Sequence, residues 1–170
     1  VLTYVFHKIT GIPKNRIIGT GCTLDSIRLR TRLSELYSVN QKQVHAYVLG
    51  EHGDSSFVAW STADISGVPL DEYENTLTDK NAVAISPYSR EEVEEYVKKS
   101  GGKIIAGKGA TFYGIAACVT QIINCIYSSA YTILPVSTIL EGEYGISDVA
   151  LSTLCAIGNE GIVTTLTPKL

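Results

Sequence analysis

The sequence contains no methionine, only one tryptophan, and no apolar run long enough to cross a membrane as a helix. Charged residues make up 18% of the 170 positions and the net charge is −3, so no basic surface indicates nucleic-acid binding. The first residues, Val-Leu-Thr-Tyr-Val, lack the basic segment of a secretory signal. We therefore expect a cytoplasmic protein that binds neither nucleic acid nor membrane.

The cysteines do not follow the spacing of a metal site or of a disulfide framework. None stands in a C-x-x-C pair, and three lie in apolar surroundings; the four are Cys22, Cys118, Cys125 and Cys155. Such cysteines are typical of free, buried thiols in a reducing compartment. The sequence thus predicts neither a metal ligand set nor a disulfide.

The length and the 45% hydrophobic content suit one domain with a sizeable core. Helical apolar spacing predicts a helix over residues 1–10 that Gly11 ends. A second helix is expected from a capping Thr23 to about Ser38, with an inward face formed by Leu24, Ile27, Arg28 and Leu36. The capping box at Ser89 predicts the start of a long helix, and the nearly uncharged segment 112–130 predicts another, buried on most sides.

Several apolar runs are expected to form strands. These are residues 16–19, 44–49, 57–60, 63–66, 131–140 and 149–157, followed by a hairpin turn at 159–161 into a last strand. The order lacks the regular β-α-β alternation of a complete nucleotide-binding sheet. The sequence therefore predicts an α+β fold in which long helices pack on an antiparallel sheet.

The run Gly-Glu-His-Gly-Asp-Ser at residues 50–55 follows the strand predicted over 44–49. Gly50 and Gly53 allow a tight turn and remove bulk beside the imidazole of His52. Histidine titrates near physiological pH, so His52 at this position is a candidate proton donor and acceptor. A solvated turn histidine is the alternative.

Asp25 and Arg28 lie three positions apart on the predicted second helix, so both side chains can point into one pocket. A carboxylate beside an imidazole fixes its tautomer and raises its pKa, and a guanidinium can bind a substrate carboxylate through two hydrogen bonds. Together with His52, these residues suit the reduction of a 2-oxo acid. An ordinary surface ion pair is the alternative.

The two stretches together resemble the L-lactate dehydrogenase family, within the lactate/malate dehydrogenase superfamily. The resemblance rests on the histidine run at 50–55, on Leu-Asp-Ser-x-Arg at 24–28, and on Gly-Lys-Gly-Ala-Thr at 107–111. It implies that His52 is the acid/base residue, with Asp25 as its partner, and that Arg28 binds the substrate carboxylate. The same resemblance implies an oxidoreductase that uses NAD to interconvert pyruvate and L-lactate in glycolysis and fermentation.

The resemblance assigns two further residues to the pocket. Thr111 matches a threonine of the substrate pocket, and Ile115 matches an apolar residue that packs against the nicotinamide ring of NAD. Without the resemblance, Thr111 is interpreted as a helix N-cap and Ile115 as a core residue. Glu51 favours lactate over malate, but L-malate or another L-2-hydroxy acid stays open as the substrate.

Arg30 and His45 resemble the allosteric anion site of bacterial lactate dehydrogenases that fructose 1,6-bisphosphate activates. This implies a homotetramer in which paired subunits donate the two cationic side chains. A solvated helix arginine and a strand histidine are the alternatives. The pair argues against the branched 2-hydroxyacid dehydrogenases, which are another neighbouring group.

We expect residues 1–170 to be the substrate-binding and catalytic domain of a longer enzyme. The family's amino-terminal Rossmann domain, with its mobile loop and second arginine, is not found in this sequence, and neither is its final helix. The chain is therefore predicted to be inactive alone. An alternative hypothesis is that the isolated domain acts only as a subunit-association module.

Overall fold

The structure, a computed structural model, describes residues 1–170 and has the expected α+β architecture. Its helices are α1 (Leu2–Thr10), α2 (Thr23–Leu36), α3 (Leu70–Thr76), α4 (Arg90–Lys108) and α5 (Tyr113–Ile126). The largest sheet is antiparallel, in the order β6 (Thr132–Glu141), β7 (Ser147–Gly158), β8 (Gly161–Leu166). Two small antiparallel sheets contain β1 (Val44–His45), β4 (Asp64–Ile65) and β5 (Val68–Pro69), and β2 (Val48–Leu49) with β3 (Phe57–Val58).

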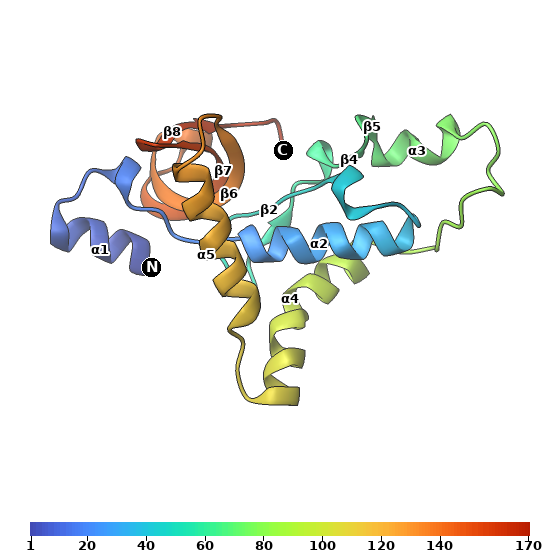
Figure 1. Ribbon diagram of the computed structural model, residues 1–170, viewed down its shortest axis with the longest axis horizontal. Coiled ribbons are helices and arrows are strands. Elements are labelled where there is room, and N and C mark those ends of the chain that lie inside the picture. Colours follow the sequence, from blue (N-terminus) through green and yellow to red (C-terminus); the bar gives the residue numbers. More distant parts are fainter.

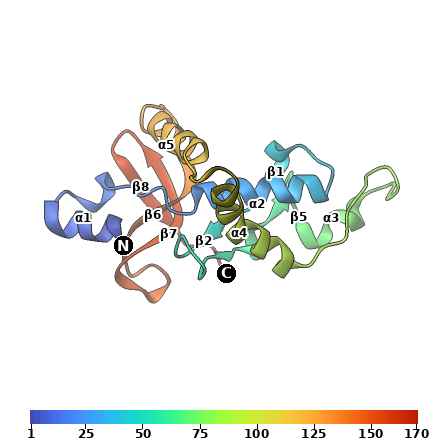
Figure 2. The same cartoon turned by 90° about the horizontal axis from the view of Figure 1, so that it is seen from below.

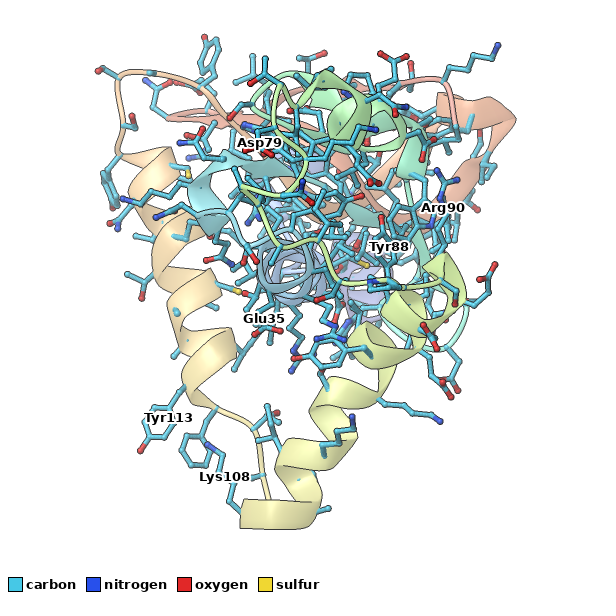
Figure 3. All side chains as sticks on the ribbon, turned by 90° about the vertical axis from the view of Figure 1, so that its right-hand side faces the viewer. Glu35, Asp79, Tyr88, Arg90, Lys108 and Tyr113 are labelled. Atoms are coloured by element: carbon cyan, nitrogen blue, oxygen red, sulfur yellow. The ribbon has the colours of Figure 1, made fainter.

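Helix α2 lies between the large sheet on one side and the small sheets with α3 on the other (Figure 1). Seen from below, α1 and α3 mark the two ends of this arrangement (Figure 2). Helices α4 and α5 leave the body and meet at a projecting tip that carries Lys108 and Tyr113 (Figure 3). At the tip, the Lys108 Nζ lies 4.6 Å from the centroid of the Tyr113 ring. None of the helices combines the length and apolarity that crossing a membrane requires.

Two clusters of apolar side chains form most of the core. The larger cluster packs α2 against α4 and the small sheets, through residues such as Leu29, Leu33 and Val97. The other cluster packs α5 against the large sheet. The capping box of α4 is present as predicted: the Ser89 hydroxyl accepts from the Glu92 N–H, while the Glu92 carboxylate accepts from the Ser89 N–H. The predicted end of α1 is also confirmed, since Gly11 adopts the left-handed conformation.

The predicted inward face of α2 is wrong apart from Leu36. Leu24, Ile27 and Arg28 are only half-buried, whereas the fully buried positions include the polar residues Thr23, Asp25 and Ser26. Thr23 does not cap the helix; its hydroxyl donates to the Pro135 carbonyl at 3.2 Å. Burial of these polar groups is possible because strands supply hydrogen-bond partners for Thr23 and Ser26, while Arg28 and His52 bond to Asp25.

The predicted strand over 44–49 is two short strands that belong to different sheets. β1 pairs with β4 and β2 pairs with β3, so the chain changes partner between His45 and Val48. The strand predicted over 16–19 is also wrong. Residues 14–16 form a 3-10 turn, and only Gly19 forms a bridge, with Ser137 of β6.

Helix α5 is less buried than predicted. Only Cys118, Ile122 and Cys125 are buried, because the large sheet covers a single side of the helix. The apolar side chains of Val119 and Ile123 remain 42% and 46% exposed. Apolar periodicity identified the helix but not the number of faces that the rest of the chain covers.

Candidate active site

The loop that carries His52 is anchored to the large sheet at its first residue. The Gly50 N–H donates to the Ser152 carbonyl at 2.9 Å, and the Ser152 N–H donates to the Gly50 carbonyl at 2.7 Å. Gly50 has a φ of +89°, which a residue with a side chain rarely adopts. This position therefore requires glycine, and it sets the point from which the histidine loop departs.

The start of α2 is fixed to Ser152 of β7 and to β2. The Cys22 N–H donates to the Ser152 hydroxyl at 2.9 Å, and the Ser26 hydroxyl accepts from the Val48 N–H at 2.9 Å. Ser152 thus holds both the histidine loop and the first turn of the helix that carries Asp25. Sequence reasoning did not identify Ser152, since a serine within an apolar strand gives no local signal of this role.

His52, Asp25 and Arg28 form one connected group. The His52 Nδ1 lies 2.6 Å from the Asp25 Oδ2, and the Arg28 Nη1 donates to the Asp25 Oδ1 at 3.2 Å. The Asp25 side chain is 8% exposed and that of Arg28 16%, whereas the His52 side chain is 60% exposed. A buried carboxylate therefore orients an imidazole whose other ring nitrogen is free to meet a ligand.

The hydrogen bond from the Asp25 carboxylate raises the pKa of His52 above the ordinary value, because it favours the charged ring. Partial burial of the ring and the nearby charge of Arg28 act in the opposite direction. The imidazolium therefore persists to higher pH than in a free histidine. Its contribution to stability is present below the unfolded-state pKa and is lost as pH rises through the raised folded-state pKa.

We expect Asp25→Asn to lower the pKa of His52, since the carboxylate that raises it is lost while partial burial and Arg28, which lower it, remain. An NMR titration of the His52 ring in the 170-residue chain measures this change. Asp54→Asn is the matched control, because Asp54 lines the same cavity without bonding to the imidazole. An Asp25→Asn protein with an unaltered His52 pKa would contradict the role of the carboxylate.

A cavity of about 350 Å³ brings the predicted site residues together. Its lining includes Asp25, Arg28, His52, Thr111 and Ile115. Thr111 lies in the loop between α4 and α5 and does not cap α5, whose N-cap is Phe112. The side chain of Ile115 is 37% exposed, so the interpretation of Ile115 as a core residue is not supported.

The cavity also has a wall on α4 that sequence reasoning missed. Lys98, Gly101, Gly102 and Ile105 all line it. These positions follow the i, i+3, i+4, i+7 spacing of one helix face, which would have identified them had the direction of that face been known.

Arg30 and His45 share a second cavity, of about 390 Å³, which has no lining residue in common with the first. Lys42, Gln41 and Gln121 also line it. Arg30 is half-buried, and this burial lowers the pKa of its guanidinium. Arg30 and His45, which the sequence paired, thus line one cavity, and the lysine and the two glutamines add further hydrogen-bond donors to it.

Cys22 lies close to the histidine–aspartate pair, and one possible ligand atom from each of Cys22, Asp25 and His52 lies within 4.8 Å of the others. The sequence did not predict this grouping. Burial raises the pKa of the Cys22 thiol to about 12, and metal ligation requires the thiolate. The His52 Nδ1 and the Asp25 Oδ2 lie 2.6 Å apart and bond to each other in this arrangement.

Comparison with known families identifies the class of protein. The model of the lactate/malate dehydrogenase alpha/beta C-terminal domain matches residues 22–170, so this chain belongs to that family. Among curated proteins, the chain is 44% identical over 162 residues to an L-lactate dehydrogenase of Acetivibrio thermocellus, covering 95% of this chain and 50% of that protein. It is 42% identical over 170 residues to an L-lactate dehydrogenase of Clostridium botulinum, covering 100% of this chain and 52% of that protein.

A solved structure has the same fold. It is a lactate dehydrogenase enzyme from a Medee basin deep-sea metagenome library, with a TM-score of 0.91 and 34% sequence identity. The match covers 99% of this chain and 52% of that one. The chain therefore spans about half the length of the relatives that it matches.

Proposed function

We propose that this chain is the substrate-binding and catalytic half of an NAD-dependent L-lactate dehydrogenase, which interconverts pyruvate and L-lactate. The observation that carries the proposal is the arrangement of His52, Asp25 and Arg28 around one cavity. The names of the relatives favour lactate over malate or another L-2-hydroxy acid. The reaction would serve glycolysis and fermentation in the cytoplasm.

Arg28 is the residue that binds the substrate carboxylate, because a guanidinium offers two parallel donors that match carboxylate geometry. Thr111 lines the same cavity and supplies a hydroxyl there. Protonated His52 then lies beside the keto oxygen and gives it a proton, while Asp25 stabilises the imidazolium before the transfer. In the reverse direction, neutral His52 accepts the proton of the lactate hydroxyl.

NADH, when bound, would supply a hydride to the keto carbon, and His52 donates the proton that completes the hydroxyl. Ile115 fits contact with the cofactor, since its apolar side chain is partly exposed in the lining of the cavity. We propose that an amino-terminal Rossmann domain, which this chain does not include, holds the rest of the cofactor.

The test compares the full-length protein with residues 1–170 in an assay of NADH oxidation with pyruvate. We expect turnover from the full-length protein and none from the 170-residue chain. Lack of turnover of pyruvate, oxaloacetate and other 2-oxo acids by the full-length protein would refute the proposed function. Turnover by the 170-residue chain would refute the proposal that a further domain is needed.

The second cavity supports an effector site for fructose 1,6-bisphosphate in a tetrameric enzyme. Arg30, Lys42 and His45 supply positive or titratable groups, and phosphate groups bind to such clusters. A two-fold axis between subunits would place two copies of the cluster on one bisphosphate. The exposed apolar side chains of α5 also favour association with other subunits.

Fructose 1,6-bisphosphate is expected to lower the KM for pyruvate of the full-length protein by about fivefold or more, within the usual range of allosteric coupling. Arg30→Gln should abolish this effect, whereas Arg16→Gln, which lies outside the cavity, should preserve it. Light scattering with and without the bisphosphate measures the accompanying association. A full-length protein that ignores the bisphosphate would contradict the effector site, and a monomer would contradict the role in association.

A further inference from the structure

Helix α4 contains two adjacent glycines, Gly101 and Gly102, that its backbone does not require. Neither residue has a positive φ, and both lie well inside a helix that ends with Gly109 as its left-handed C-cap. Glycine is the least favourable residue in a helix interior apart from proline. The reason for this pair must therefore be sought in the space around it.

The pair leaves open space in the wall of the active-site cavity. A Cβ atom at Gly101 would lie 3.9 Å from the Arg28 Nη1 and Nη2, and a Cβ atom at Gly102 would have no heavy atom within 4 Å. A Cβ atom would fit at either position without a clash, so close packing against the backbone does not explain the glycines. Because neither glycine has a side chain, the cavity is larger directly beside the Arg28 guanidinium.

Three hydrophobic side chains line this cavity among mostly polar residues. Leu24, Ile105 and Ile115 are the hydrophobic residues that line the cavity, and Ile105 lies one turn beyond the glycines on α4. Lys98 lies one turn before them and also lines a neighbouring acidic hollow with Glu94 and Glu95. Lys98 thus also faces carboxylates, and Ile105 supplies hydrocarbon on the α4 side of the space beside Arg28.

We propose that Gly101 and Gly102 determine substrate specificity by admitting aliphatic 2-oxo acids whose side chains are longer than the methyl group of pyruvate. The inference rests on the proposed function, because Arg28 must hold the carboxylate for the substrate side chain to reach this wall. Arg30 and His45 lie in the other cavity, so they do not limit the size of the substrate.

The experiment compares full-length wild-type protein with the double variant Gly101→Ala/Gly102→Leu. The ratio of kcat/KM for 4-methyl-2-oxopentanoate to that for pyruvate should fall by about tenfold or more, since the added carbons occupy the space of the longer side chain. Gly107→Ala is the matched control. It is also an α4 glycine with open space around its Cβ position, but it does not line the cavity, so the ratio should stay at the wild-type value.

Thermal unfolding shows whether the double variant is folded, and its midpoint should be no lower than that of the wild type because both substitutions raise helix propensity. If the double variant unfolds, the single variant Gly102→Ala replaces it. This variant fills less of the space, so the kcat/KM ratio should fall by a smaller factor. Pyruvate turnover with an unchanged ratio in the folded variants would overturn the inference and leave the proposed function standing. A preference of the wild type for oxaloacetate would also overturn it, and no turnover of any 2-oxo acid would overturn both.

Discussion

Replacement of His52 by alanine in the full-length enzyme is expected to lower kcat for pyruvate reduction by about 10²- to 10⁴-fold, the usual contribution of general acid catalysis. The imidazole lies 2.6 Å from a buried carboxylate that favours its protonated form, and no other imidazole lines the cavity. Steady-state kinetics with saturating pyruvate and NADH measures the change. In the wild type, the rate should fall as pH rises through the raised pKa of His52, and the variant should lose this dependence.

A matched control separates loss of the proton donor from general damage. His7 lies on α1 outside the cavity, so His7→Ala should keep both the rate and its pH dependence. Binding of NADH, followed by its fluorescence, should persist in the His52 variant. A normal rate in His52→Ala would remove this residue from the acid/base role.

Arg28→Gln is expected to lower kcat/KM for pyruvate by about 10²- to 10⁴-fold, because it removes two hydrogen bonds to a charged group at about 1.5–3 kcal/mol each. Most of the loss should appear as a higher KM, since the carboxylate is bound before and during the reaction. Arg28→Lys should be intermediate, because it keeps the charge but not the paired donors.

Arg32→Gln is the control for Arg28. Arg32 lies on the same helix and pairs with Glu35 at the surface, so its replacement should change kcat/KM little. Initial-rate kinetics over a range of pyruvate concentrations distinguishes a change in KM from a change in kcat. An Arg28→Gln enzyme with the KM of the wild type would show that another residue binds the carboxylate.

Asp25, Arg28 and His52, which the sequence grouped, line one cavity, and the signals that single them out are local. The spacing of Asp25 and Arg28 follows from helix geometry alone, and the glycine-flanked His52 follows from turn chemistry. The long helices and the hairpin strands could be predicted for the same reason. The family model and the relatives agree with the family that the resemblance indicated.

What failed depended on contacts between distant segments. The sequence could not show that β-strand partners would make the buried polar start of α2 favourable, so its inward face was assigned to the wrong residues. Nor could apolar periodicity reveal that the sheet covers only one side of α5. The wall formed by Lys98, Gly101, Gly102 and Ile105 went unnoticed because its direction depends on how α4 packs on α2.

Ser152 gives the catalytic geometry a single mechanical reference point. Its main chain holds the loop of His52 and its hydroxyl holds the amino end of the aspartate-bearing helix, although it lies 130 positions after Cys22. We therefore expect His52 and Asp25 to move together when β7 moves, so that thermal motion of the strand does not by itself separate them. If the proposed proton transfer takes place, the alignment that it needs is set by the largest sheet of the domain rather than by the loop that carries the histidine.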